Sequence, residues 1–136
     1  MLFFESIEAH PADWSALIFK DKVITFGELR QTVDNWAAYL QAKGLQKGER
    51  VGLFSKNCPE FVAAYHAIVK AGGVVVPINF MLSPTETSFI IKDASVKMMF
   101  VQEVIDLEAA LEKRGCDPVE QITFAEISAA PEAVPA

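Results

Sequence analysis

The sequence predicts an α/β domain in which an N-terminal hairpin and an amphipathic helix precede β/α units that form a mainly parallel sheet. Two patterns carry this prediction. Apolar residues at helical spacing fill one early segment, and from Arg50 onward short apolar runs of strand length alternate with capped helical segments. The expected strands begin near Val51, Val74, Met98 and Ile122. Their starts lie about 24 residues apart, which suits a strand, a crossover helix and two short loops.

The hairpin comes first. Two β-rich runs, 16–19 and 23–25, flank the polar residues 20–22, and this arrangement predicts two antiparallel strands with a tight turn. The segment from Thr25 to Glu28 then predicts a helix start, because the hydroxyl and the carboxylate can each accept a free backbone N–H. We expect one amphipathic helix over residues 26–43, ended by Gly44, with Leu29, Val33, Trp36 and Leu40 on its apolar face.

The later helices carry their own start and stop signals. Asn57 with Glu60 predicts one N-terminal cap, and that helix is expected to end at the glycine pair 72–73. The segment 83–86, Ser-Pro-Thr-Glu, predicts a stronger cap because it combines a capping Ser, Pro at the first helical position and Glu at the third. We expect a further helix over residues 105–114.

The end of the chain has too little bulk to pack. After Ile127 it contains mainly Ala, Pro and other small residues, which predicts a disordered linker or truncated tail over residues 129–136. Residues 1–128 are expected to form the folded unit. A length of 136 residues suits one domain with a single core.

Composition narrows the possible partners. The chain is 51% hydrophobic and 22% charged, which indicates surface meant for burial against another element. Its net charge is -6, with no basic stripe, so we expect no nucleic-acid partner. The start of the chain has no signal-peptide pattern, and no apolar run approaches the roughly 20 residues of a transmembrane helix. Two cysteines without metal-ligand spacing favour a reducing, cytoplasmic setting.

Motifs that carry chemistry are missing. A phosphate-binding loop would place glycines between a strand and the following helix, whereas the pair 72–73 follows an expected helix and precedes a strand, as a helix cap does. Open parallel sheets bind ligands beyond the carboxyl ends of their strands, where this chain has segments 55–58, 79–81 and 102–103. Ser55, Asn79 and Gln102 stand where a phosphate-accepting receiver domain would need acids.

Four other side chains have a functional and a structural interpretation. Cys58 stands at a helix start, where the dipole favours a thiolate, but we favour a structural thiol. His66 could be a base or metal ligand; without a second ligand at suitable spacing we expect a surface or interface residue. Trp36 and Tyr39 could stack on a ligand ring, although Trp36 fits the helix core better. We assign no catalytic, cofactor-binding or metal-binding residue.

The order of several short segments along the chain indicates a protein family more specifically than any single motif does. They are 24–29 (Ile-Thr-Phe-Gly-Glu-Leu), 44–53 (Gly-Leu-Gln-Lys-Gly-Glu-Arg-Val-Gly-Leu), 57–61 (Asn-Cys-Pro-Glu-Phe), 67–73 (Ala-Ile-Val-Lys-Ala-Gly-Gly), 76–79 (Val-Pro-Ile-Asn) and 82–86 (Leu-Ser-Pro-Thr-Glu). Together they resemble the beginning of adenylate-forming, AMP-binding enzymes, the superfamily that includes acyl-CoA synthetases. Among its members, a ligase for a fatty or other lipophilic acid looks nearest.

The resemblance implies a parent enzyme that uses ATP and Mg2+ to convert a carboxylic acid into an acyl-adenylate and then transfers the acyl group to CoA. The family's phosphate loop, ribose-binding Asp, hinge and catalytic Lys come later than this chain's end, so none is carried over. Many members have Arg where this chain has Met81, so no CoA contact is assigned either. The large domain of such enzymes would contain this segment as a partial α/β scaffold.

Three hypotheses follow. The first is an N-terminal fragment of a CoA ligase, inactive alone, whose partner is the remainder of the parent enzyme. The second is a self-standing binding or assembly module, and the third is a small α/β enzyme that uses Cys58. If the chain is a fragment, we expect it to form a homo-oligomer. The contact would use a sheet edge or the face of the helix 26–43 that carries Leu29, Trp36 and Leu40.

Overall fold

The computed structural model describes residues 15–19, 22–56 and 58–129. The hairpin is present: β1 (Ser15–Phe19) pairs antiparallel with β2 (Lys22–Thr25). Residues 20 and 21, in the expected turn, lie outside the described residues. The N-terminal arm, 1–14, lies outside them as well. Of the expected tail, 129–136, Ala129 is described as the last residue of a helix, and 130–136 lie outside the described residues.

The first long helix, α2 (Phe26–Ala42), confirms the predicted amphipathic helix. The backbone N–H of Glu28 donates to Thr25 Oγ1, and the backbone N–H of Thr25 donates to Glu28 Oε1, each at 3.2 Å. These two bonds satisfy donors that a helix start otherwise leaves free. Gly44 adopts a φ of +90°, the left-handed conformation that ends a helix at little steric cost.

Four parallel strands form the central sheet: β3 (Arg50–Phe54), β4 (Val74–Ile78), β5 (Met98–Val101) and β6 (Glu120–Thr123). Their order in the sheet is β4-β3-β5-β6. The chain runs from β3 out to β4 and then returns past β3 to β5. The strand order therefore reverses between β3 and β5, and this reversal marks the topological switch point of the sheet. The predicted parallel α/β architecture is confirmed.

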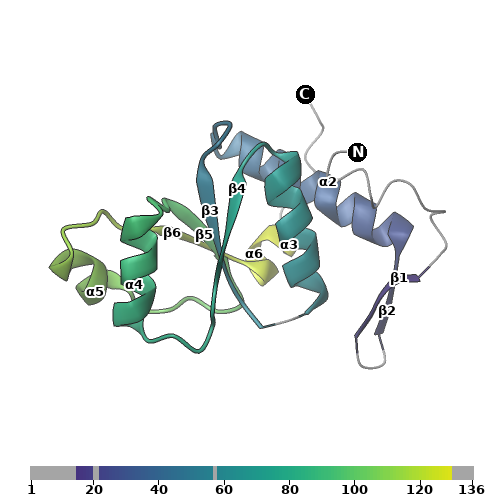
Figure 1. The fold of residues 1–136 in the computed structure, drawn as a ribbon. Coiled ribbons are helices and arrows are strands. Elements are labelled where there is room, and N and C mark those ends of the chain that lie inside the picture. Colours follow the sequence, from purple (N-terminus) through teal and green to yellow (C-terminus); the bar gives the residue numbers. More distant parts are fainter. Residues whose placement is uncertain (1–14, 20–21, 57, 130–136) are drawn as a thin grey trace.

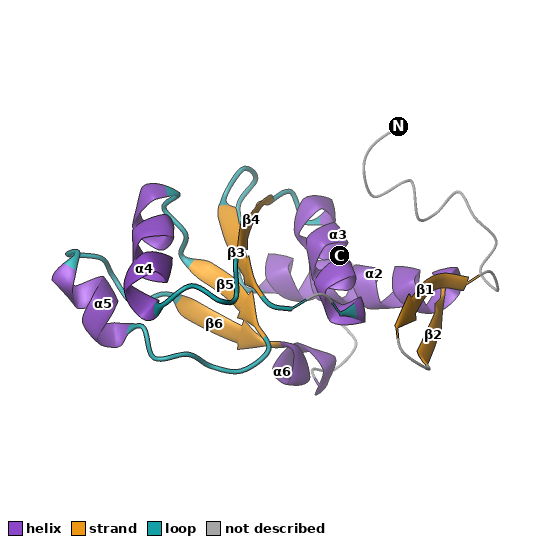
Figure 2. Ribbon diagram, turned by 60° about the horizontal axis from the view of Figure 1, so that its bottom comes forward, coloured by secondary structure: helices purple, strands orange, loops and turns teal. Residues whose placement is uncertain are grey.

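Helices cover both faces of this sheet (Figures 1 and 2). One face carries α2, α3 (Pro59–Lys70) and α6 (Phe124–Ala129), and the other carries α4 (Pro84–Asp93) and α5 (Glu108–Lys113). A parallel sheet needs this arrangement because its strands are apolar on both sides.

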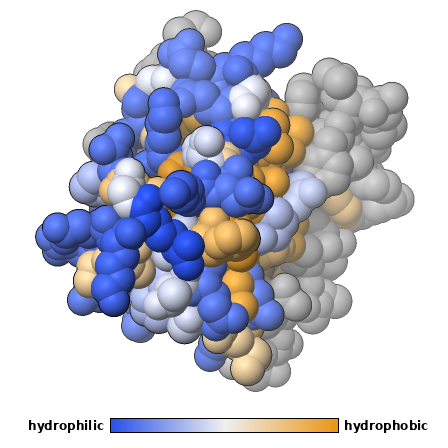
Figure 3. All heavy atoms as spheres, turned by 60° about the vertical axis from the view of Figure 1, so that its left-hand side comes forward, coloured by the Kyte–Doolittle hydropathy of each residue, from blue (hydrophilic) through white to orange (hydrophobic). Residues whose placement is uncertain are grey.

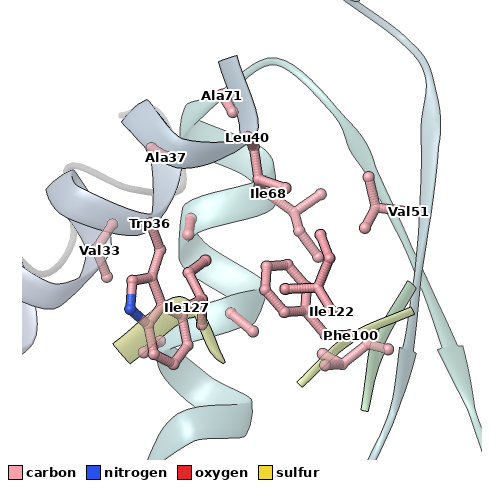
Figure 4. Packing of buried hydrophobic residues seen from close by; sticks show 14 of the residues in the cluster. Val33, Trp36, Ala37, Leu40, Val51, Ile68, Ala71, Phe100, Ile122 and Ile127 are labelled. Atoms are coloured by element: carbon pink, nitrogen blue, oxygen red, sulfur yellow. The ribbon is translucent and has the colours of Figure 1, made fainter. Parts of the chain in front are cut away.

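The larger of the two apolar cores lies between the sheet and the side with α2, α3 and α6 (Figure 4). Trp36 stacks on Phe100 and on Phe124 with ring centroids 6.0 and 5.8 Å apart. Leu29 and Leu40, on the same helix face, are 3% and 0% exposed. The expectation that this face forms a contact between copies is therefore wrong, because its side chains already pack inside the domain.

The smaller core lies under α4 and α5. It contains Ile78, Ile91, Val96, Met99, Val101, Leu107 and Leu111. Gly52 lies at its centre on β3, where an added Cβ would come within 2.9 Å of Met99 Cβ. Only a glycine lets the strand and its neighbour approach this closely.

The structure corrects the predicted elements in three places. Helix α5 begins at Glu108 and not at residue 105, because the backbone of Ile105 is bonded to the side chain of Gln121. Helix α6 was not predicted; its first turn receives a cap from Thr123 Oγ1, which accepts the N–H of Glu126 at 3.0 Å. The N-cap of α3 is Cys58, without a side-chain bond, and the expected cap residue Asn57 lies outside the described residues.

Candidate functional site

The carboxyl edge of the sheet brings together three of the residues that the sequence singled out. Ser55 follows β3, Gln102 follows β5, and Cys58 precedes α3. The Ser55 hydroxyl donates to the carbonyl of Lys56 at 2.8 Å and lies 3.6 Å from Cys58 Sγ. The Gln102 amide approaches the same sulfur at 3.9 Å through Nε2 and accepts the Lys56 N–H at 3.3 Å through Oε1. We call Ser55, Cys58 and Gln102 the switch-point cluster.

Asn79, the third expected edge residue, is not part of this cluster. Its Oδ1 accepts the N–H of Met81 at 2.9 Å and so stabilises the loop between β4 and α4. The ammonium of Lys56 lies 5.7 Å from the ring centroid of Phe80 in that loop, at the distance of a cation–π contact. The described edge residues therefore include amides, a hydroxyl, a thiol and an ammonium, and Glu103 next to Gln102 adds a carboxylate.

Cys58 has the environment of a structural thiol. Burial raises the pKa of its thiol, although the hydrogen bond with Ser55 and the backbone N–H of Phe61 act in the opposite direction. A raised pKa keeps the sulfur protonated at neutral pH, and a protonated thiol is a poor nucleophile. This environment supports the structural interpretation and gives no support to an enzyme that uses Cys58.

His66 is 8% exposed and lies on α3, so the expectation of a surface or interface position is wrong. Its ring meets the ring of Tyr65 edge to face, with centroids 6.4 Å apart. Burial lowers the pKa of His66, so the imidazole is neutral at pH 7. The helical pattern had assigned this residue to a polar face, but α3 is packed on more than one side.

Trp36 and Tyr39 lie in different environments. Trp36 is 4% exposed and belongs to the core, which confirms its structural interpretation. Tyr39 donates its hydroxyl to Glu126 Oε2 at 3.1 Å and carries the ammonium of Lys43 5.5 Å from its ring centroid. Burial, and next the bond to Glu126, raise the pKa of Tyr39. Tyr39 thus ties α2 to α6, and its ring is in contact with Lys43 and partly buried against the larger core.

The edge loops do not fit a nucleotide phosphate or a metal ion. The loops after β3, β4 and β5 contain no glycine, and glycines are what lets several backbone N–H groups surround a phosphate. The N–H groups of Gly72 and Gly73 donate to the carbonyls of Val69 and Ile68, as in a helix cap. Within the described ranges, no group of three or more His, Cys, Asp and Glu side chains could hold a metal ion. Nor does any described helix have the length and apolarity to cross a membrane.

One feature was not anticipated from the sequence. A groove of about 1030 Å3 lies beside α5. We call it the α5 groove; it is lined by Val104, Ile105, Asp106, Leu107, Glu108, Leu111, Glu112, Gly115, Cys116, Pro118, Val119 and Gln121. Apolar and acidic residues alternate over 105–108, a segment that the sequence predicts to start a helix.

The doubly wound sheet, its switch point and its capped helices place this chain in the class of open parallel α/β domains. The family model described as "AMP-binding enzyme" matches residues 3–135, and the chain belongs to that family. It is 33% identical over 103 residues to 4-hydroxybutyrate–CoA ligase 2 of Metallosphaera sedula, covering 76% of this chain and 19% of the relative. It is 31% identical over 115 residues to the long-chain-fatty-acid–CoA ligase of Bacillus subtilis, covering 85% and 20%.

The chain is also similar to proteins that are not named as CoA ligases. Gramicidin S synthase 2 of Brevibacillus brevis is 33% identical over 102 residues, covering 75% of this chain and 2% of the relative. Among solved structures, apo MatB from Rhodopseudomonas palustris aligns with a TM-score of 0.80 at 25% identity, covering 98% of this chain and 29% of that one. The chain spans about a fifth of the length of the two CoA ligases it matches.

Proposed function

We propose that this chain is the N-terminal part of a ligase that activates a carboxylic acid with ATP and transfers the acyl group to CoA. The observation that carries the proposal is the family match over residues 3–135, together with two relatives named as CoA ligases. In this proposal the remainder of the ligase is the main partner of the chain. Its setting is the cytoplasm, where thiols such as those of Cys58 and Cys116 stay reduced.

The contribution of the chain is a scaffold. ATP, Mg2+ and CoA would be cofactors of the whole ligase, but the edge loops described above lack the glycines that would surround a phosphate, and no described group of three or more ligands could hold a metal. We therefore assign no step of the reaction to these residues and expect the isolated chain to be inactive. A fatty acid is the substrate that we propose, in keeping with the named substrate of the Bacillus relative.

The coding sequence downstream of Ala136 tests the proposal. A Ser/Thr/Gly-rich phosphate loop with its Lys is expected in frame within about 60 residues, given typical domain sizes. The protein encoded by that longer frame should then catalyse pyrophosphate exchange with ATP in the presence of a fatty acid. A panel that adds 4-hydroxybutyrate and 3-hydroxybenzoate, the acids after which two relatives are named, and an amino acid separates the proposed substrate from the alternatives.

The isolated chain is the matched control in this assay. Exchange above the buffer level by residues 1–136 alone would contradict the scaffold role, whichever acid was supplied. If the longer protein catalysed exchange only with an aryl acid or an amino acid, the proposed ligase function would stand and the proposed fatty-acid substrate would be wrong.

A self-standing, non-catalytic module is the second candidate. One observation favours it: helices already cover both faces of the sheet, so each core is closed by residues of this chain. An in-frame stop codon directly after Ala136, with cooperative unfolding of the isolated chain, would favour this candidate over the ligase fragment.

A further inference from the structure

The α5 groove lies beside a sheet edge that has no partner among the described residues. Its walls are the loop 102–107, α5 and the segment 115–121, which leads into β6. Strand β6 is bonded to β5 on one side only. Its other edge therefore presents main-chain groups next to the groove, and such edges readily accept a further segment of chain.

The groove is preformed because one side chain braces its wall. The amide of Gln121 accepts the N–H of Ile105 at 2.9 Å and donates to the carbonyl of Ile105 at 2.8 Å. This pair of bonds joins the loop to β6 as a strand neighbour would. Asp106 Oδ1 accepts the N–H of Glu108 at 3.3 Å and braces the start of α5 in addition. A ligand would meet a wall that is already ordered, which lowers the entropic cost of binding.

The floor of the groove is apolar and its rim is acidic. Leu107 and Leu111 are 2% and 3% exposed and anchor the floor in the smaller core, whereas Val104 is 70% exposed at the mouth. The rim carries the exposed carboxylates of Glu108 and Glu112, and no Lys or Arg lines the groove. Figure 3, which brings forward the side of the molecule that carries α4 and α5, shows hydrophobic residues among hydrophilic ones.

Arg114, the residue directly after α5, is directed toward α4. Arg114 donates through Nε to Ser88 Oγ at 2.7 Å and through a terminal nitrogen to the carbonyl of Thr85 at 3.3 Å. Its guanidinium also lies 5.3 Å from the ring centroid of Phe89. These contacts hold the guanidinium against α4, and the charged side chains that line the groove are Asp106, Glu108 and Glu112.

We propose that the α5 groove binds a short peptide segment that combines apolar side chains with Lys or Arg. The apolar side chains would occupy the floor, and the cations would meet Glu108 and Glu112 at the rim. Charge complementarity disfavours a second copy of this chain, whose net charge is -6. The inference does not depend on the ligase function, because it concerns no substrate or cofactor of that reaction.

The test is a titration of the 15N-labelled chain, followed by 1H–15N correlation spectra, with three synthetic decapeptides. One alternates Leu with Lys, one alternates Leu with Glu, and one alternates Ser with Lys. We expect the Leu-Lys peptide alone to produce saturable shifts focused on residues 104–121. Val104→Ser and the double variant Glu108→Gln, Glu112→Gln should each weaken this binding about fivefold, the scale of a few surface contacts.

Two matched variants control for surface apolarity and charge. Val74 lies on the opposite edge strand and is 47% exposed, and Asp93 is exposed at the end of α4. Val74→Ser and Asp93→Asn should bind the Leu-Lys peptide as the parent chain does. All four variants change exposed positions, and their spectra report whether the fold is retained.

Several results would overturn the proposal. Shifts spread evenly over the surface, or equal binding by the Ser-Lys peptide, would indicate attraction to the net charge alone. Binding of the Leu-Glu peptide would remove the role of the acidic rim. Unchanged affinity in the Val104 and Glu108/Glu112 variants would place the peptide outside the groove.

Discussion

The backbone N–H of Lys56 donates to Oε1 of Gln102 at 3.3 Å and so joins the loop after β3 to the loop after β5. These two strands flank the point where the strand order of the sheet reverses. In open α/β sheets a ligand normally enters the crevice at this point. Here Gln102 bridges this crevice. Ser55 bonds to the Lys56 carbonyl and to Cys58 Sγ, and the same sulfur accepts from Gln102 Nε2. The first prediction concerns the thiol in this cluster.

Cys58 should react slowly with iodoacetamide at pH 7, more slowly than free glutathione, because burial raises the pKa of its thiol. The rate should continue to rise beyond the pH at which glutathione is fully ionised. Alkylation is measured by mass spectrometry in a Cys116→Ser background, so that one thiol remains. Gln102→Ala should increase the rate several-fold by uncovering the sulfur. A rate above that of glutathione in the parent chain would show that the thiol is activated.

His66 should make stability sensitive to acid. Its folded-state pKa is lowered by burial, so the unfolded chain binds a proton more readily than the folded chain. Protonation of His66 in the unfolded chain therefore costs no stability above the unfolded pKa of about 6.5, and the free energy of unfolding falls as the pH drops below that value. Urea unfolding at pH 7.5 and at pH 5 measures the loss. His66→Gln should reduce the difference between the two pH values.

Trp36 should be a major contributor to the larger core. Removing its ring leaves a cavity beside Phe100 and Phe124, and such truncations cost about 3 to 5 kcal/mol of unfolding free energy. Urea denaturation followed by circular dichroism gives the value for Trp36→Ala. The comparison is Val74→Ala, at a half-exposed edge position, which should change stability by no more than about 0.5 kcal/mol. Similar effects for the two variants would mean that α2 is not anchored through its aromatic face.

The isolated chain should self-associate as its concentration rises. The face of α2 is buried, so the contact should use the exposed apolar residues of the loop after β4 or an edge of the sheet. Phe80 and Met81 in that loop are 40% and 78% exposed. Light scattering across a concentration series measures the mass, and the double variant Phe80→Ser, Met81→Ser should shift it toward the monomer. A monomeric mass at every concentration would show that these surfaces do not pair in solution.

The sequence by itself determined the local elements and their class. The Thr25 to Glu28 and Ser83 to Glu86 segments predicted two capping boxes that the structure contains, because such caps depend only on residues within one turn. The strand spacing predicted the parallel sheet, since a crossover helix needs a nearly constant length of chain. The ordered segments also predicted the family to which the chain belongs.

Only the tertiary structure decided which side chains meet. His66 is buried because neighbouring elements cover a side of α3 that helical periodicity alone assigns to solvent. Helix α5 starts at Glu108 because Gln121, 16 residues away from Ile105, takes the backbone groups that a longer helix would have used. The α5 groove and the switch-point cluster likewise join segments that are distant along the chain. Local propensity acts within a few residues, whereas these contacts depend on how the strands are ordered and the helices packed.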